Sequence, residues 1–128
     1  MKLLLDTHVL FWWLTARSRL CRPTLDALSR IDSEIYVSVV SAWKMAIKVG
    51  AGKWPAAVPI LQTFEDHVSI EQFRLLPITV PHVRAAGLMA SPHRDPFDRL
   101  LAAQAQIEGL TLVTADARVQ TLGVTWLW

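Results

Sequence analysis

Acidic side chains recur where short apolar segments of this sequence end. Asp6 follows the apolar segment Lys2–Leu5, Asp95 and Asp98 open a long periodic segment, and Asp116 follows a late apolar run. Carboxylates gathered in one cleft repel each other, and a hard divalent cation such as Mg²⁺ or Mn²⁺ is their usual counter-charge. These positions therefore predict a metal site that hydrolyses phosphodiesters, since a bound cation activates water and stabilises a leaving oxygen.

Each acidic residue also has a purely structural interpretation, and the residues alone leave both open. Asp6 is suited to cap a first helix, and Asp116 to form a turn or a cap. Asp95 before a proline is typical of an N-cap. The negative charge of Asp98 in the first turn would be stabilised by the helix dipole. Three hydroxyl residues near the same segment ends are expected to support the acids or to cap helices: Thr7, Ser38 and Thr114.

Apolar and turn-forming residues predict the elements that must position these side chains. Strands are expected at Lys2–Leu5, Glu34–Ser38, Arg74–Ile78, Thr111–Thr114 and Val124–Leu127. Helices are expected at His8–Ala16, Pro23–Ile31, Val39–Val49, Pro59–Phe73, Pro81–Met89, Pro96–Glu108 and Ala117–Leu122. Short apolar strands that alternate with helices favour one α/β domain over residues 1–128, with a mostly parallel central sheet covered on both faces. Ligands bind such sheets beyond the carboxyl ends of the strands.

Composition excludes several classes of protein. The chain has 128 residues, of which 52% are hydrophobic, so a disordered chain is excluded. The formal charge of +2 permits nucleic-acid binding, but the sequence has no basic run. One cysteine, Cys21, excludes an internal disulfide, and no apolar run is long enough to cross a membrane, which predicts a cytoplasmic protein. Gly-rich phosphate loops and the GxSxG motif are absent.

Other reactive or aromatic residues are interpreted as structural. The four histidines lack the spacing of metal ligands and are predicted to be structural or surface residues: His8, His67, His82 and His93. Cys21 is interpreted as a passive thiol. The six tryptophans are expected in the core or at a partner interface rather than as platforms for bases.

Four segments together resemble the PIN-domain family, and more narrowly its VapC-type toxins. They are LLLDTHVLFWW, SVVSAWKMAIKVGAGKW, HRDPFDRLLAAQAQIEG and LVTAD, which span nearly the whole chain. The resemblance implies a three-layer α/β/α fold and a Mg²⁺- or Mn²⁺-dependent endoribonuclease. It also implies a homodimer and inhibition by a small cognate antitoxin. The acidic positions of the family correspond to Asp6, Asp98 and Asp116, and Asp95 would assist through water or as a helix cap.

One position departs from the family pattern. An acidic residue usually follows the tryptophan of the second segment, whereas this chain has Lys44. An ammonium near two carboxylates acts as an internal counter-ion. We therefore expect Lys44 to pair with Asp6 or Asp98 and to weaken metal binding and activity. The alternative is a lysine that points to solvent beside Lys48.

Two functions of other classes remain open from the sequence. The first is a module that binds an antitoxin or RNA without catalysis, its acidic pocket closed by Lys44. The second is a phosphotransfer domain, which is disfavoured because its acceptor aspartate should follow a middle strand. The predicted middle strands end instead at Ser38 and at Pro77-Ile78-Thr79.

Overall fold

A parallel five-stranded sheet forms the centre of the computed structural model, which describes residues 1–128. The strands are β1 (Lys2–Leu5), β2 (Glu34–Ser38), β3 (Arg74–Leu76), β4 (Thr111–Val113) and β5 (Trp126–Leu127). Their order across the sheet is β3-β2-β1-β4-β5, and every neighbouring pair is parallel. The α/β class and the parallel sheet predicted from the sequence are confirmed.

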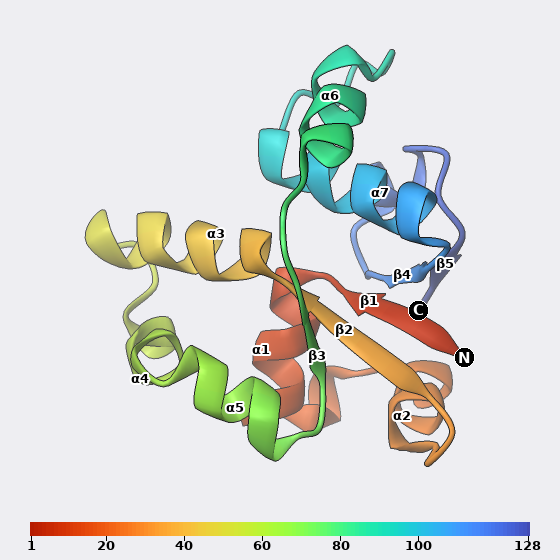
Figure 1. The fold of residues 1–128 in the computed structure, drawn as a ribbon. Coiled ribbons are helices and arrows are strands. Elements are labelled where there is room, and N and C mark those ends of the chain that lie inside the picture. The colour runs from red at the N-terminus through yellow and green to blue at the C-terminus, as the bar shows by residue number, and fades with distance from the viewer.

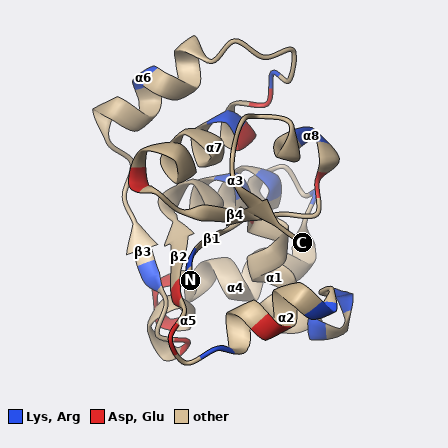
Figure 2. Cartoon of the chain, turned by 90° about the vertical axis from the view of Figure 1, so that its right-hand side faces the viewer, with Lys and Arg blue, Asp and Glu red and all other residues tan.

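Helices cover both faces of the sheet (Figures 1 and 2). One face carries α1 (Thr7–Thr15), α2 (Arg22–Ser29), α4 (Val58–Gln62) and α5 (Phe64–Ile70). The other carries α6 (Val80–Leu88), α7 (Pro96–Glu108) and α8 (Ala117–Gln120). Helix α3 (Val39–Gly50) continues directly from β2 and extends beyond the carboxyl edge of the sheet.

Successive residues of β1 supply two separate hydrophobic cores. Leu3 and Leu5 point into the core shared with α1, α2, α4 and α5, whereas Leu4 points into the core shared with α7. All three leucines are completely buried. A strand buried on both faces has no polar side, which explains why this segment is a continuous apolar run.

The predicted helix over Pro59–Phe73 was wrong in one respect, because the chain breaks at Thr63 into α4 and α5. Thr63 adopts φ −124° and ψ 36°, and its hydroxyl donates to the carbonyl of Pro59. The bend lets Ile60 and Phe64 from the two short helices enter one core. Burial of these side chains outweighs the local preference for a continuous helix.

Other differences concern the ends of elements. Strands β3 and β5 are shorter than predicted, and short 3₁₀ turns at Arg17–Arg19 and Pro55–Ala57 were not predicted. Helix α6 begins at Val80 with a capping box in which Thr79 and the buried His82 satisfy each other's backbone groups. None of the helices is long and apolar enough to cross a membrane.

Candidate active site

A cleft of about 620 Å³ lies beyond the carboxyl ends of β1 and β4, where a parallel sheet places its ligands. Side chains from α1, α3, the start of α7 and the segment after β4 line it. Four of the lining residues are acidic and four are basic: Asp6, Asp95, Asp98 and Asp116, and Lys44, Lys48, Lys53 and Arg118. All four aspartates singled out from the sequence therefore face one cleft.

Asp6 is both a helix cap and a buried acid of the cleft. Its Oδ1 accepts a hydrogen bond from the Thr7 amide at 2.7 Å and so caps α1. Its Oδ2 accepts from the hydroxyl of the fully buried Thr114, also at 2.7 Å. Because each carboxylate oxygen has two lone pairs, both oxygens keep a free acceptor position. Thr114 thus supports Asp6, as the sequence predicted.

Asp98 lies in the first turn of α7 between a histidine and a lysine. Its Oδ2 lies 2.8 Å from His93 Nε2, and its Oδ1 lies 3.9 Å from the Lys44 ammonium. Burial raises the pKa of Asp98, and the Asp95 and Asp6 charges add to this, while the His93 hydrogen bond and Lys44 oppose it. The Lys44 side chain is only 11% exposed. Lys44 therefore pairs with Asp98, as predicted, and does not point to solvent.

Asp95 acts as the N-cap of α7. Its Oδ1 accepts from the amides of Phe97 and Asp98 at 2.9 and 3.2 Å. The adjacent Pro96 occupies the first turn, where its missing N–H has no cost. These contacts orient the turn that carries Asp98.

A pair of variants separates the capping role of Asp95 from metal binding. Asp95→Ala is expected to lower the free energy of unfolding by about 1 kcal/mol, whereas asparagine keeps the cap and costs only a few tenths. Calorimetric Mn²⁺ titration should give affinities within about threefold of the parent for both variants, since a capping residue does not contact the ion. A tenfold loss in Asp95→Asn, with the fold intact, would instead make Asp95 a metal ligand.

Asp116 caps α8 and pairs with Arg118. Its Oδ1 accepts from the Arg118 amide at 2.9 Å, and its Oδ2 lies 3.2 Å from the guanidinium. Burial alone would raise the pKa of Asp116, but the hydrogen bonds from Arg118 outweigh burial and lower it. Arg118 therefore neutralises the third acid of the cleft.

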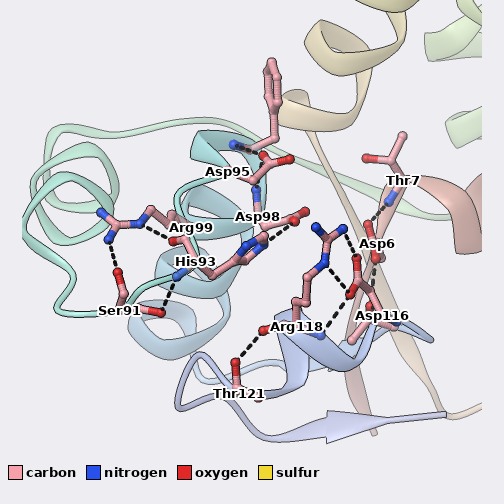
Figure 3. Close-up of polar contacts among 12 residues, drawn as sticks. Asp6, Thr7, Ser91, His93, Asp95, Asp98, Arg99, Asp116, Arg118 and Thr121 are labelled. Carbon is pink, nitrogen blue, oxygen red and sulfur yellow. Dashed lines mark hydrogen bonds and ion pairs between the residues drawn. The ribbon is translucent and has the colours of Figure 1, made fainter.

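Arg99 holds the segment between α6 and α7 in place. Its guanidinium donates to four backbone carbonyls, those of Ala86, Met89, Ser91 and His93, at 2.8 to 3.2 Å. This segment carries His93, whose ring reaches Asp98 (Figure 3). The residue after Asp98 thus positions the histidine that contacts Asp98.

Several expectations about the site need correction. Ser38 does not line the cleft: it caps α3 and donates to Gln104 Oε1 at 2.6 Å, which ties α3 to α7. Thr7 meets the site only through its amide, since its hydroxyl lies 2.9 Å from Ser41 Oγ. His93 bonds to Asp98 and His8 lines the cleft, two contacts with the site that the interpretation of the histidines as structural or surface residues did not include. The sequence did hold one indication of this contact, because His93 lies only two residues before the Asp95 cap of the helix that carries Asp98.

The carboxylate oxygens in the cleft are the type of ligand that a hard cation binds. Asp6 keeps a free acceptor position on each oxygen, and Asp98 Oδ1 faces only the more distant ammonium. Mg²⁺ prefers such oxygen donors, and one or two carboxylates with water suffice to hold it. No group of three or more acidic, histidine or cysteine residues is arranged as a complete metal site. Lys44 pairs with Asp98 and Arg118 pairs with Asp116 instead.

Comparison with known proteins agrees with this arrangement. The model of the PIN domain family matches residues 3–124. The chain is 33% identical over 120 residues to "Ribonuclease VapC22" of Mycobacterium tuberculosis, covering 92% of this chain and 89% of that protein. This chain belongs to the PIN-domain family and is a homologue of the VapC ribonucleases. The predicted family resemblance is confirmed.

Solved structures share the fold of this VapC homologue. VapBC2 of Rickettsia felis, crystallised with a DNA fragment from its promoter, matches with a TM-score of 0.71 at 15% identity, over 99% of this chain and 98% of that one. A toxin–antitoxin complex from Klebsiella pneumoniae matches with a TM-score of 0.65 at 20% identity, over 98% and 95% of the chains. VapBC-5 of Mycobacterium tuberculosis gives a TM-score of 0.60 at 17% identity, over 98% and 95%. The three-layer PIN-like architecture is thereby confirmed.

Proposed function

We propose that this VapC homologue is a Mg²⁺- or Mn²⁺-dependent endoribonuclease toxin whose activity is weakened by Lys44. The observation that carries the proposal is the placement of Asp6 and Asp98, which are 6% and 3% exposed and line one cleft at the carboxyl edge of the sheet. Burying two carboxylates is costly unless a counter-charge is close. In a nuclease that counter-charge is a metal ion.

Asp6 and Asp98 would hold the cation, with Asp116, whose amide donates to the same Thr114 hydroxyl that contacts Asp6, as a third acid. The bound cation would supply an activated water and stabilise the leaving oxygen of a phosphodiester. Thr114 and the Thr7 amide hold Asp6 in one orientation, and His93 does the same for Asp98. Fixed orientation of the acids limits the reorganisation needed when substrate binds.

Lys44 weakens this arrangement because its ammonium lies where a cation would gain most from Asp98. The charge of Lys44 already stabilises the ionised form of Asp98. A divalent cation entering the cleft must overcome repulsion from this charge or displace the side chain. We therefore assign the protein a lower metal affinity than a chain with a carboxylate at this position.

The test is cleavage of single-stranded RNA by the purified protein with Mn²⁺, compared with EDTA and with Asp6→Asn. We expect slow cleavage that requires Mn²⁺ and is absent from Asp6→Asn. Asparagine retains acceptor and donor groups for Thr7 and Thr114, so the variant should melt close to the wild type. No cleavage by the wild type, and none after Lys44→Glu, would contradict the ribonuclease proposal.

The Lys44–Asp98 pair also favours a second candidate, a non-catalytic module that binds antitoxin or RNA. In this case the internal ion pair replaces the metal ion permanently. Binding without turnover, unaffected by Mn²⁺ in both the wild type and Lys44→Glu, would identify this function.

The proposed partners are a cognate antitoxin, an RNA substrate and a second copy of the chain. One structure with this fold is a toxin–antitoxin complex, and another is a member of the VapBC family of toxin–antitoxin systems. The exposed side chains of Trp43 on α3 and Val83 on α6 line a second cavity of about 490 Å³, and Val80 and Leu88 of α6 are exposed as well. Exposed apolar surface of this kind is usually covered by a protein partner.

Since the proposed substrate is RNA, we place the protein in the cytoplasm.

A further inference from the structure

The lysines of this chain are concentrated on one wall of the cleft. The sequence has four lysines, and three of them, Lys44, Lys48 and Lys53, line the cleft. They come from α3 and the turn that follows it, whereas the acids come from the ends of β1 and β4 and the start of α7. Lys44 is paired with Asp98, but no acidic side chain lies within ion-pair distance of Lys48 or Lys53. The chain therefore presents two uncompensated positive charges beside the acidic site.

Aromatic rings adjoin these two lysines. His8 and Trp12, one turn apart on α1, line the cleft, with ring centroids 5.8 Å apart. The ring of His8 is stacked on Trp54, at 4.9 Å and an interplanar angle of 22°. The Lys48 ammonium lies 5.6 Å from the centre of the Trp54 ring. Trp54 thus stacks on the His8 ring and also has the Lys48 ammonium near its own ring.

We infer that this aromatic and basic wall, His8, Trp12, Lys48 and Lys53, binds an unpaired segment of the RNA strand beside the acidic site. Lys48 and Lys53 contact phosphates, and the rings of His8 and Trp12 contact a base. The inference rests on the proposed ribonuclease function and names the surface that holds its substrate.

The combination of charges and rings favours a single strand of nucleic acid. Proteins that bind single strands combine a basic groove along the backbone with aromatic side chains on which bases stack. A base inside a duplex has no free face for such contacts, so the strand must be unpaired. The acids of the cleft would repel a phosphate chain, so the lysines of α3 and the following turn offer its favourable path.

Binding without cleavage tests the inference separately from catalysis. The probe is a short 5′-fluorescein-labelled single-stranded RNA of mixed sequence, titrated in EDTA and followed by fluorescence anisotropy. The variants are Lys48→Gln with Lys53→Gln, His8→Ala and His8→Phe. Lys2→Gln is the matched control, because Lys2 lies at the amino end of β1, opposite to the cleft, and is the remaining lysine. Circular dichroism melts verify that each variant is folded.

The double lysine variant is expected to reduce the slope of log Kd against log salt concentration by about 1.4, because each phosphate contact on a single strand contributes roughly 0.7. His8→Ala is expected to weaken binding about tenfold, and His8→Phe to keep it within about threefold, since a phenyl ring preserves stacking. Lys2→Gln should leave both quantities unchanged. The same RNA annealed to its complement should bind more weakly than the single strand.

The outcomes separate this inference from the proposed function. Cleavage by Lys44→Glu with unchanged RNA binding by the lysine and His8 variants overturns the inference and leaves the ribonuclease intact. Loss of binding in these variants, with no cleavage by any form, supports the binding surface and removes the catalytic proposal. Equal binding of duplex and single strand, or no binding by the wild type, overturns the inference.

Discussion

Replacing Lys44 with glutamate is expected to tighten Mn²⁺ binding by at least about tenfold and to make RNA cleavage correspondingly faster. The change removes a positive charge 3.9 Å from Asp98 Oδ1 and introduces a carboxylate beside Asp6 and Asp98. A third oxygen donor and the loss of a repelling ammonium both favour a divalent cation, and an effect of 1.4 kcal/mol already amounts to tenfold.

The same variant should be less stable than the wild type without metal. Asp98 would lose its compensating charge and gain a like-charged neighbour in a buried position, which costs about 2–4 kcal/mol. The melting temperature in EDTA is therefore expected to fall by roughly 10 °C. Saturating Mn²⁺ should recover most of this loss, because a ligand that binds only the folded state stabilises it.

The loss of stability should depend on pH. Burial raises the pKa of Asp98 above its ordinary value, so the folded protein retains this proton at a pH where the unfolded chain has released it. Stability associated with Asp98 is therefore greatest below its ordinary pKa and declines as pH rises through the raised value. Lys44 limits this decline because it lowers that pKa. In EDTA, Lys44→Glu should thus be close to the wild type near about pH 4 and clearly weaker at about pH 8.

Calorimetric Mn²⁺ titrations and thermal melts in EDTA and in Mn²⁺ are the measurements. Lys44→Gln is the matched control, because it removes the positive charge without adding a carboxylate. Its Mn²⁺ affinity should lie between those of the wild type and Lys44→Glu. If Lys44→Glu binds Mn²⁺ no more tightly than the wild type, Lys44 does not control the site.

Replacing Arg99 with leucine is expected to lower the free energy of unfolding by about 3 kcal/mol. The guanidinium donates to the carbonyls of Ala86, Met89, Ser91 and His93, and leucine leaves all four without this partner. The segment between α6 and α7 should then open more often, and the His93 ring should lose its contact with Asp98. Arg99→Lys should restore little, since one ammonium cannot reproduce the planar fork of donors.

Chemical denaturation and amide hydrogen exchange test the role of Arg99. The amide of His93, which donates to Ser91 Oγ, should exchange much faster in Arg99→Leu. Arg94→Leu is the matched control in the same segment, because Arg94 is exposed, and it should change stability by no more than about 0.5 kcal/mol. Equal stability of the two leucine variants would show that the four hydrogen bonds are not needed to hold the segment.

Features that depend on neighbours along the chain could be read from the sequence. The apolar runs and their spacing predicted a parallel sheet, and the positions of Asp6 and Asp116 just after two predicted strands placed them at its carboxyl edge. Asp95 with Pro96 predicted the start of α7 and so the place of Asp98. The pairing of Lys44 was predicted because the family resemblance places position 44 beside the acids, where an ammonium compensates carboxylate charge.

Contacts between distant segments were decided only by the tertiary structure. Ser38 was predicted to support the site, yet packing of α3 on α7 directs its hydroxyl to Gln104. The break at Thr63, the reach of His93 to Asp98 and the stacking of His8 on Trp54 likewise depend on which elements pack together. Local periodicity and capping specify where an element begins and which side of it is apolar. The direction of a polar side chain depends on partners that burial of the two cores brings close. These partners are distant along the chain and cannot be identified from local sequence patterns.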